Sequence, residues 1–474
     1  MCGFIFAKTK RALTASSIVD AGKYLRYRGP DSSKQLHIRD ADGSYLFFMH
    51  FLLDMSGRSV PQPITDVDNK NLVLLFNGEV YNYGSLFQSA SDTEAIIPTF
   101  KSNPADWFKQ LDGEFAVLIA DLDSQRVSIA TDPFLTKPLY IGRSSDPSEF
   151  GIATYASSLR ALGFSTVQML EPNAHYTISY GKRSISITED FPSFGFSANQ
   201  QSSDFSVWEQ YFLAAVKKRA LHGAHRPMVA LSSGYDSGAI ALALNLLKIP
   251  YETYSIQAGE NQEILKNRLR VNSNVCTNAT LISGLSKTER KRISNEIRHS
   301  VEPFDYVHTD GGTIRHSLST DGGAIGAYAI AELAREKGIR EVLSGCGADE
   351  IYSDYGFNGK KIYPHSEFGG IFPEELDGFF PWKKFYGDTQ RSYLFKDEII
   401  YGRHGIEGRY PFLDRDLVQA FLSLKAELKN AEYKAPLANF LRKHGYPFED
   451  GRKRGFSPQK DPLLRRIRRK LRLV

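Results

Sequence analysis

Hydrophobic and polar positions divide the chain into two parts with different periodicity. Up to about residue 190, short apolar runs end in turn residues, as at 45–49, at 72–76 before Asn77-Gly78, and at 115–120 before Asp121. Runs of this length that are bounded by turn residues are typical of β-strands. We therefore predict a first domain, residues 1–190, that is built mainly of strands with brief helices.

A stretch without apolar periodicity follows this domain. Residues 191–206 read FPSFGFSANQQSSDFS and are rich in Ser, Asn, Gln and Gly. Such a composition gives no face that a helix or strand could bury. We predict that residues 191–206 form a linker.

Beyond residue 206 the pattern changes to alternating strands and helices. Residues 228–231 form an apolar run that predicts a buried strand, and we predict further strands at 251–256 and 341–343. Residues 237–247 and 326–337 predict helices, the second of which stops at Gly338. This order favours βαβ units in a parallel sheet. We assign residues 207–474 to this second domain. Within it the phrase Thr-Asp-Gly-Gly occurs at 309–312 and at 320–323, which we interpret as a Gly-rich loop.

The composition is that of an ordinary globular protein and excludes a disordered or collagen-like chain. Of 474 residues, 42% are hydrophobic and 24% are charged. No apolar run approaches the roughly 20 residues that a membrane helix needs, and the first residues lack a basic and apolar leader pattern. We expect a cytoplasmic protein without a membrane span.

The basic excess lies at the end of the chain. The net charge is +5, yet residues 452–474 hold ten basic residues and one acidic residue, so the rest of the chain is net acidic. Leu464, Ile467, Leu471 and Val474 have helical spacing, which predicts an amphipathic helix over 461–474. Docking on the second domain is the favoured role of this helix. Binding to an anionic membrane surface and contact with nucleic acid are the alternatives, and we expect no nucleic-acid partner.

Cys2 is a candidate nucleophile. The chain has three cysteines, Cys2, Cys276 and Cys346, too few and too scattered for a disulfide framework or a paired metal site. A small residue after Met1 permits removal of Met1, and the α-amine of Cys2 can then act as general base for its own thiol. Asn77-Gly78 offers an amide side chain and a backbone N–H that can stabilise an oxyanion.

Two strand-to-loop segments of the second domain offer phosphate chemistry. The sequence Leu-Ser-Ser-Gly-Tyr-Asp-Ser at 231–237 leads from a strand into a helix, where backbone N–H groups and the helix dipole favour an anion such as pyrophosphate. The segment lacks Walker spacing, and a simple capped turn is the alternative. The second segment, 342–350, carries Asp349, which together with Asp236 is a candidate for holding Mg²⁺. In a parallel sheet both loops lie at the carboxyl edge.

Taken together, the motifs resemble the glutamine-dependent asparagine synthetase family over nearly the whole chain and in that family's order. The matching segments are Cys2-Gly3, residues 28–31, 77–82, 91–94, 112–116, 132–140, 232–237, 344–350, 405–414 and 453–456. The resemblance implies an α+β N-terminal nucleophile hydrolase sandwich of αββα layers, followed by an α/β Rossmann-like parallel-sheet ATP-pyrophosphatase domain. It also implies that glutamine supplies ammonia through an internal tunnel to a carboxylate that ATP has activated as an acyl-adenylate.

The resemblance also implies roles for individual residues. Cys2 is the nucleophile and its own base, Asn77 and Gly78 form the oxyanion hole, and Lys453 faces the phosphates. Glutamine is bound by Arg28, Glu79 and Asp92, the last of which is suited to a substrate ammonium group. ATP and pyrophosphate contacts fall on Ala230, Ser232, Ser233, Gly234, Asp236, Ser237, Ile256, Ser344 and Gly345, and Mg²⁺ falls on Asp236 and Asp349. ATP and Mg²⁺ are therefore expected, with small-molecule substrates; a homodimer stays open.

Three positions depart from the family pattern. Leu52 stands where the family has an arginine that pairs with the glutamine carboxylate, so either Arg58, Arg26 or Arg28 replaces it or glutamine binds weakly. Cys346 stands where the family has a glutamate beside the acyl centre; a small apolar role for Cys346 is favoured over a nucleophilic one. The segment after residue 305 is longer and rewritten, which suggests a larger or different acceptor.

These observations leave three hypotheses. The first is an ATP-dependent, glutamine-hydrolysing amidotransferase with aspartate as the default acceptor and a different carboxylate, of a sugar, peptide or specialised metabolite, second. The second is an intramolecular amide or β-lactam former with a weakened glutaminase domain. The third is a regulatory or RNA-binding protein on an inactive synthetase scaffold, which the joint presence of Asp236, Asp349 and Lys453 argues against.

Overall fold

The computed structural model describes residues 2–180, 185–190, 192–309, 313–451 and 458. The described residues form two compact units that are not continuous in sequence. Unit 1 combines the chain up to Phe196 with His222–His225 and Tyr401–Glu407, and unit 2 contains Ser197–Leu221, Arg226–Ile400 and the described residues from Gly408 on. The chain therefore passes between the units several times.

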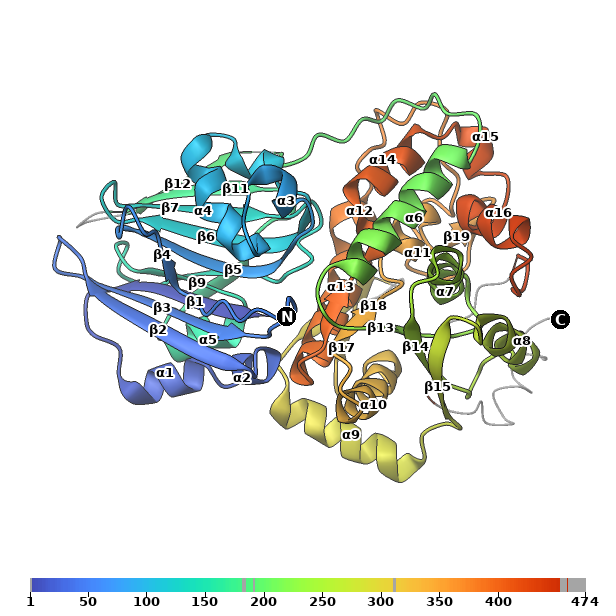
Figure 1. The fold of residues 1–474 in the computed structure, drawn as a ribbon, viewed down its shortest axis with the longest axis horizontal. Coiled ribbons are helices and arrows are strands. Elements are labelled where there is room, and N and C mark those ends of the chain that lie inside the picture. Colours follow the sequence, from blue (N-terminus) through green and yellow to red (C-terminus); the bar gives the residue numbers. More distant parts are fainter. Residues whose placement is uncertain (1, 181–184, 191, 310–312, 452–457, 459–474) are drawn as a thin grey trace. The chain divides into compact units, whose positions relative to one another are not determined.

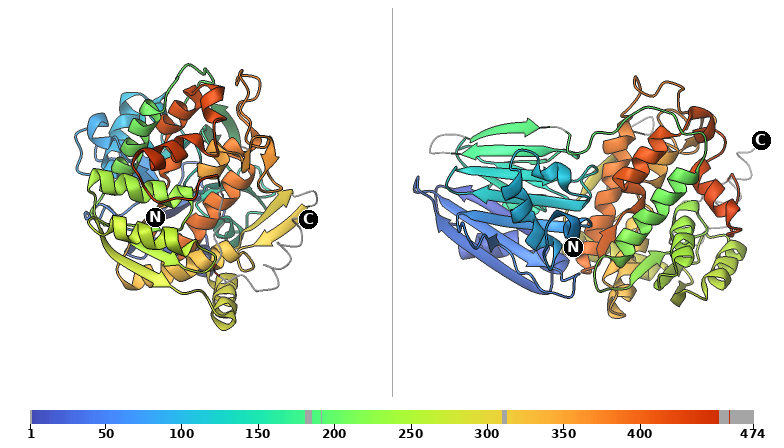
Figure 2. Two further views of the ribbon diagram at one scale, coloured as in Figure 1. Left: turned by 90° about the vertical axis from the view of Figure 1, so that its right-hand side faces the viewer. Right: turned by 45° about the horizontal axis from the view of Figure 1, so that its top comes forward.

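Unit 1 is built of two antiparallel sheets with helices on their outer sides. In the described residues the first sheet has the strand order β10-β8-β9-β1-β3-β2 and the second has the order β12-β11-β7-β6-β5-β4. Figures 1 and 2 show the sheets face to face, with α1, α2 and α5 on the first and α3 and α4 on the second. These layers confirm the predicted αββα sandwich. The strands are β1 (Gly3–Thr9), β2 (Ser32–Arg39), β3 (Tyr45–Leu52), β4 (Ile64–Thr65), β5 (Leu72–Val80), β6 (Gly113–Asp121), β7 (Arg126–Thr131), β8 (Tyr140–Arg143), β9 (Phe150–Ala153), β10 (Thr166–Met169), β11 (His175–Tyr180) and β12 (Ile185–Asp190), and the helices are α1 (Ala15–Ala21), α2 (Leu25–Arg28), α3 (Tyr83–Leu86), α4 (Asp92–Ser102), η1 (Trp107–Gln110) and α5 (Ala156–Ala161).

Strand β5 carries the polar residues of the predicted glutaminase site on one face. Leu72, Leu74 and Phe76 pack with α4 and η1 in one hydrophobic cluster. Because side chains alternate along a strand, Asn77 and Glu79 face the opposite way, toward the first sheet. The prediction that this strand closes at Asn77-Gly78 is wrong, since β5 continues to Val80 in register with β6.

Unit 2 is built around a sheet with the strand order β15-β14-β13-β18-β21 in the described residues, and the pairs β13–β14, β13–β18 and β14–β15 are parallel. Helices α6, α7, α14 and α16 contact one another, as do α9 and α10, and Figure 1 shows the two groups on opposite faces of the sheet. This arrangement confirms the predicted α/β domain. The strands are β13 (Pro227–Ala230), β14 (Tyr251–Ile256), β15 (Cys276–Ile282), β16 (Asp305–Thr309), β17 (Thr313–Ser317), β18 (Glu341–Leu343), β19 (Gly356–Phe357), β20 (Lys360–Lys361) and β21 (Glu407–Arg409), and the helices are α6 (Ser206–Leu221), α7 (Tyr235–Leu247), α8 (Gln262–Asn272), α9 (Lys287–Ser300), α10 (Gly322–Glu336), α11 (Ala348–Tyr352), α12 (Lys383–Tyr386), α13 (Asp388–Arg403), η2 (Pro411–Leu413), α14 (Arg415–Ser423), α15 (Ala426–Lys429) and α16 (Ala435–Lys443).

The two Thr-Asp-Gly-Gly phrases do not form one Gly-rich loop. The first begins at the end of β16, and its residues 310–312 lie outside the described residues. In the second, Asp321 caps α10, since its Oδ1 accepts hydrogen bonds from the backbone N–H groups of Gly323 and Ala324. This cap starts α10 four residues earlier than the predicted start at 326.

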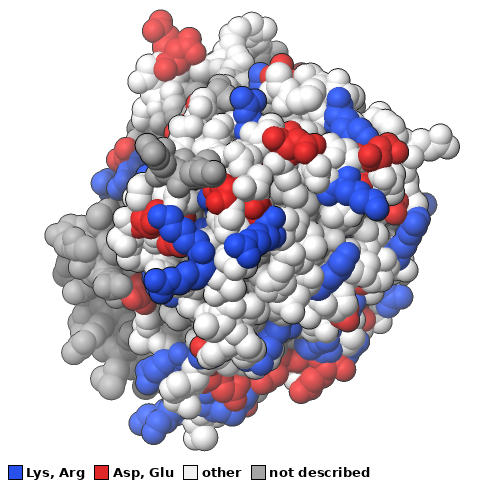
Figure 3. All heavy atoms as spheres, turned by 90° about the vertical axis from the view of Figure 1, so that its left-hand side faces the viewer, with Lys and Arg blue, Asp and Glu red and all other residues white. Residues whose placement is uncertain are grey.

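Two surface expectations can be compared with the structure. None of the helices in the described part of the chain combines the length and apolar composition needed to cross a membrane. Figure 3 shows one face of the molecule, on which basic and acidic side chains are interspersed. The predicted tail helix over 461–474 lies outside the described residues.

Candidate active sites

The thiol of Cys2 lies at the start of β1 in unit 1. Its Sγ lies 3.7 Å from the carbonyl oxygen of Leu53, and its own carbonyl accepts a hydrogen bond of 2.6 Å from Arg28 Nε. Burial raises the pKa of the Cys2 thiol to about 11, and the nearby carboxylates of Glu407 and Glu79 add to this rise. The group is therefore a thiol at neutral pH, and a base must accept its proton before it can act as a nucleophile.

Asn77 and Gly78, which we predicted to form an oxyanion hole, have unusual surroundings. The Asn77 side chain is fully buried, and neither its oxygen nor its nitrogen has a hydrogen-bond partner among the described residues. An orphaned buried amide costs about 1–3 kcal/mol, so it points to a ligand. Gly78 has φ +128°, and a Cβ there would lie 1.9 Å from the Glu114 carbonyl oxygen. Beside them, burial lowers the pKa of His50 to about 3, so its ring, 3.0 Å from the Phe76 carbonyl, is neutral.

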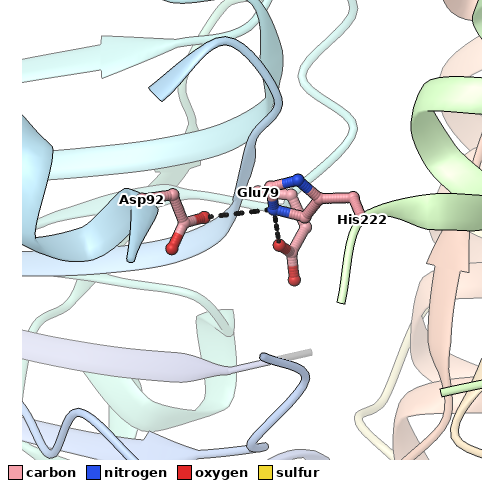
Figure 4. Close-up of side chains that lie close together, drawn as sticks. All are labelled: Glu79, Asp92 and His222. Carbon is pink, nitrogen blue, oxygen red and sulfur yellow. Dashed lines mark ion pairs between the residues drawn. The ribbon is translucent and has the colours of Figure 1, made fainter. Parts of the chain in front are cut away.

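A cluster of two carboxylates and one imidazole lies at the end of β5. Nε2 of His222 is 2.6 Å from Glu79 and 3.8 Å from Asp92 Oδ2, and Figure 4 shows both carboxylates turned toward the ring. Asp92 begins α4, and its Oδ2 also accepts a hydrogen bond from Val80 N. These three groups could hold a metal ion. Ligands at a zinc ion, however, lie about 3.3 Å apart for bonds of 2.0–2.1 Å in tetrahedral geometry. The shorter contact between His222 and Glu79 is that of a hydrogen bond.

The arginines proposed to replace the family's carboxylate-binding residue have different surroundings. Leu52 is buried at the end of β3. Arg28 is fully buried, and its Nη1 donates a hydrogen bond of 3.3 Å to Tyr155 in addition to its contact with Cys2. Arg58 is half-exposed and pairs with Glu94 at 3.1 Å. Arg26 lines a cavity of about 310 Å³ together with Ile18, Val19, Gly22, Ser33, Lys34, Gln35, Met49 and Phe51, which contains none of the candidate catalytic residues.

The loop between β13 and α7 in unit 2 uses its own polar groups. Ser232 N donates to Ser237 Oγ at 3.0 Å, and Gly234 N donates to Ser232 Oγ at 3.1 Å. The backbone N–H and the hydroxyl of Ser233 both donate to one carboxylate oxygen of Glu260, at 2.5 Å each. Glu260 thus accepts hydrogen bonds from groups that we predicted to bind a phosphate. A bound anion would therefore have to displace the Glu260 carboxylate.

Asp236 and Asp349 lie together, as predicted, and Lys434 connects them. Nζ of Lys434 is 2.6 Å from Asp236 Oδ1 and 2.8 Å from Asp349 Oδ1, and the phenol of Tyr433 donates to the same Asp349 oxygen at 2.9 Å. The ammonium group is buried, and these two carboxylates keep the pKa of Lys434 above its usual value despite burial. Carboxylate oxygens suit Mg²⁺, and the two carboxylates with one ammonium retain a net negative charge, so the residues fit a magnesium ion.

The loop after β18 approaches this pair closely. A Cβ at Gly345 would lie 2.9 Å from Asp236 Cβ, so only glycine allows the two loops this separation. Ser344 Oγ donates to Asp397 Oδ2 at 2.7 Å, and Cys346 Sγ lies 3.5 Å from the same oxygen. Burial raises the pKa values of both Asp397 and Cys346. The carboxyl group of Asp397, on α13, therefore lies beside Cys346, which stands where the resemblance leads us to expect a glutamate.

The remaining predicted nucleotide contacts lie at strand ends. Ala230 is the last residue of β13 and is partly exposed, and Ile256 is the last residue of β14 and is buried. The two strands are neighbours, which places both residues at one edge of the sheet. Lys453 lies outside the described residues.

Sequence reasoning missed four residues that hold these sites together. His222, Glu260 and Lys434 each pair with a predicted site residue, and Arg268 supports the β13–α7 loop by donating to the carbonyl oxygens of Ser232 and Gly234 at 2.6 and 2.7 Å. For Arg268 the sequence offers one indication, which is the glycine at 238: a Cβ at Gly238 would lie 2.5 Å from the Arg268 guanidinium. The others are single polar residues, which no periodicity distinguishes from solvated ones.

Comparison with known proteins gives matches over both parts of the chain. Residues 1–187 match the model of the glutamine amidotransferase domain, and residues 208–369 and 382–472 match the model of asparagine synthase. Three similar proteins are named as glutamine-hydrolyzing asparagine synthetases. The one from Methanocaldococcus jannaschii is 27% identical and aligns with 89% of this chain and 80% of its own. Those from Schizosaccharomyces pombe and Saccharomyces cerevisiae are 28% and 27% identical, cover 86% and 85% of this chain, and each align over 72% of their own length.

Proposed function

Because the chain belongs to the asparagine synthase family, we propose that it hydrolyses glutamine in unit 1 and uses the ammonia in an ATP-dependent amidation of a carboxylate in unit 2. One observation carries this proposal. Asp236 and Asp349, in the segments that follow β13 and β18, both form an ion pair with Lys434. Relatives over most of the chain do not favour the hypothesis of a weakened glutaminase domain. The substrates are small molecules: glutamine, ATP and a carboxylate, with aspartate as the acceptor.

The glutaminase reaction proceeds through a thioester. The sulfur of Cys2 attacks the side-chain amide carbon of glutamine, and the oxyanion is stabilised by N–H donors of Asn77 and Gly78. Ammonia leaves, and water then hydrolyses the thioester to release glutamate. Because burial raises the pKa of the thiol to about 11, the α-amine of Cys2, exposed by removal of Met1, takes the proton during attack.

Glutamine is held by polar groups around the thiol. Asp92 and Glu79 bind its α-ammonium group, and Arg28, whose Nε donates to the Cys2 carbonyl, positions the nucleophile. In the absence of the family's arginine at position 52, Arg28 and Arg58 are the candidates for the carboxylate of glutamine.

The synthetase reaction begins with adenylation. The acceptor carboxylate attacks the α-phosphorus of ATP and releases pyrophosphate, which makes AMP the leaving group for the later attack by ammonia. The triphosphate replaces Glu260 as the acceptor for the N–H and hydroxyl groups of Ser233. Lys434 pairs with both Asp236 and Asp349 and so fixes the separation of the two carboxylates. Mg²⁺, bound by Asp236 and Asp349, would neutralise the phosphate charge.

Amide formation follows when ammonia attacks the acyl carbon and AMP departs. The attacking nitrogen must lose a proton, and the family's glutamate at this point is replaced by Cys346. Asp397 Oδ2 lies 3.5 Å from the Cys346 sulfur, and burial raises the pKa of Asp397, which suits a group that accepts and returns a proton.

The experiment that tests this function measures two products in parallel. Pyrophosphate release from ATP, Mg²⁺ and glutamine is followed with and without aspartate, and glutamate formation is followed for wild type and Cys2→Ala. We expect aspartate to stimulate pyrophosphate release, Cys2→Ala to lose only the part that glutamine supports, and ammonium chloride to restore it. Asp236→Ala is expected to abolish pyrophosphate release while glutamate formation continues.

The outcomes separate the parts of the proposal. Pyrophosphate release that aspartate does not affect, with glutamate still formed, would mean that the acceptor is another carboxylate. Pyrophosphate release that survives in Asp236→Ala would contradict the assignment of the unit 2 site. Mass spectrometry of the N-terminus tests the removal of Met1.

A further inference from the structure

A short segment that follows α6 belongs to unit 1. Residues His222–His225 cluster with the glutaminase fold, although Leu221 before them and Arg226 after them belong to unit 2. Ala224 N donates to the Met55 carbonyl at 2.9 Å, and His225 Nε2 lies 3.1 Å from the Asp54 carbonyl. These partners directly follow Leu53, whose carbonyl contacts the Cys2 thiol. The segment therefore lies along the backbone that borders the nucleophile.

His222 is the residue of this segment that reaches the acidic pair. Its Nε2 is 2.6 Å from Glu79 and 3.8 Å from Asp92, and its ring packs edge-on against the rings of Tyr81 and Tyr83. The side chain of His222 is 13% exposed. Two carboxylates and two aromatic rings thus surround one imidazole.

A protonated imidazole resembles the α-ammonium group of an amino acid in the properties that these carboxylates recognise. Each offers a positive charge and N–H donors within hydrogen-bond distance of Glu79. Nε2 of His222 lies 2.6 Å from Glu79 Oε2 and 3.8 Å from Asp92 Oδ2, so an ammonium group that contacted the same two oxygens would overlap the imidazole. His222 and the α-ammonium group of glutamine therefore compete for one position.

We propose that His222 is a built-in competitor for glutamine, which occupies the ammonium position of the glutaminase site until glutamine displaces it. The inference rests on the proposed function, because that function assigns Glu79 and Asp92 to glutamine. His222 is thus a specificity-determining residue: a ligand must bring its own cation to replace the imidazole, so an amide without an α-ammonium group does not open the site.

The competition predicts a defined change in kinetics. When the binding-competent state is only fractionally populated, the apparent affinity falls by that fraction. If His222 occupies the pair for about 80–90% of the time, its removal lowers the KM for glutamine roughly five- to tenfold. The kcat for glutamate formation stays unchanged, because His222 is absent from the site once glutamine is bound.

The experiment compares glutamate formation by the full-length wild type, His222→Ala and Leu221→Ala. Leu221 is the exposed neighbour of His222 at the end of α6, so its truncation is a matched control and leaves KM unchanged. His222→Gln keeps a polar side chain without charge and is expected to lower KM as well, which covers the case in which His222→Ala fails to fold. An unchanged or higher KM in the folded His222 variants overturns the proposal, because it makes His222 a structural residue or a binding residue.

A binding measurement distinguishes failure of this inference from failure of the proposed function. If neither wild type nor His222→Ala forms glutamate, the glutaminase assignment is wrong. Calorimetry with glutamine on Cys2→Ala and on Cys2→Ala/His222→Ala then decides the inference alone. A dissociation constant at least about fivefold lower in the double variant supports displacement, and equal constants or an absence of binding in both overturn it.

Discussion

At the residue scale, Asn77 places a buried amide on β5 without a hydrogen-bond partner in the described structure. Neither its oxygen nor its nitrogen is satisfied, and its side chain is fully buried. A group of this kind destabilises the fold and persists where a bound molecule uses it. Stability and catalysis should therefore respond in opposite directions to its replacement.

We expect Asn77→Leu, which has nearly the same shape without polar atoms, to keep or raise the melting temperature. The kcat for glutamate formation should fall by about 10²–10³, the loss typical of one oxyanion donor. Differential scanning calorimetry and a glutamate assay on the same preparation measure both. A lower melting temperature with retained activity would show instead that the amide has a structural partner.

Lys429 provides a second residue-scale prediction, which concerns pH. Its ammonium group is buried, donates to Gln200 Oε1 and to the Leu422 carbonyl, and has no ion-pair partner in the described part of the chain. Burial lowers the pKa of Lys429 to about 7. Between about pH 7 and the ordinary lysine pKa near 10.4, the unfolded chain binds the extra proton, so stability rises with pH over that range.

Lys429→Met removes this titration. The free energy of unfolding of wild type, minus that of Lys429→Met, should increase from pH 7 to pH 9.5 by up to about 1.4 kcal/mol per pH unit. Urea unfolding of both proteins at the two pH values measures the difference. A difference that is constant with pH would mean that Lys429 stays charged in the folded protein.

At the scale of elements, the two loops of the synthetase site depend on each other. The loop after β18 comes so close to the start of α7 that a Cβ at Gly345 would meet Asp236 Cβ at 2.9 Å. Gly345→Ala should displace Asp236 from Lys434 and lower the rate of pyrophosphate release at least tenfold, while glutamate formation in unit 1 continues. Gly378→Ala is the control, since a Cβ there meets nothing within 4 Å. Equal pyrophosphate rates in the two variants would show that the loops tolerate a greater separation.

Periodicity predicted the elements better than it predicted their ends. The strands at 251–256 and 341–343 agree with β14 and β18 residue for residue. The strand through Asn77-Gly78 was ended too early, since Asn-Gly is a turn signal and only the pairing of Gly78 with Phe115 shows that the ladder continues.

The candidate site was predictable where its residues follow strand ends in sequence. Asp236 and Asp349 were placed together by the rule that parallel strands end at one sheet edge. Lys434 was missed because it is 198 residues from Asp236 and directly precedes another element, α16, whose start carries no motif. His222 was missed for the same reason: which carboxylate a lone histidine pairs with depends on tertiary contacts alone.

At the scale of the whole molecule, unit 1 is not a single continuous stretch of the chain. Unit 1 also contains His222–His225 and Tyr401–Glu407. In the segment 401–407, the guanidinium of Arg403 lies 4.0 Å from the centre of the Tyr27 ring. The carboxylate of Glu407 contributes to the raised pKa of the Cys2 thiol. A fragment that ends at residue 196 would lose the segment 401–407, which contacts Tyr27, and the segment 222–225, which contains His222.

We therefore expect a fragment of residues 1–196 to melt about 5 °C or more below the glutaminase unit of the full chain, since each kcal/mol shifts a domain of this size by about 2–4 °C. Its KM for glutamine should nevertheless be lower, because His222 is absent. The loss of glutaminase activity on heating and the KM of both proteins test this.

Arg403→Ala in the full chain separates the two effects. This variant loses the contact with Tyr27, worth about 0.5–1 kcal/mol, so its stability should fall. It keeps His222, so its KM for glutamine should stay unchanged. A fragment as stable as the full chain, with an unchanged KM, would show that neither inserted segment contributes to unit 1.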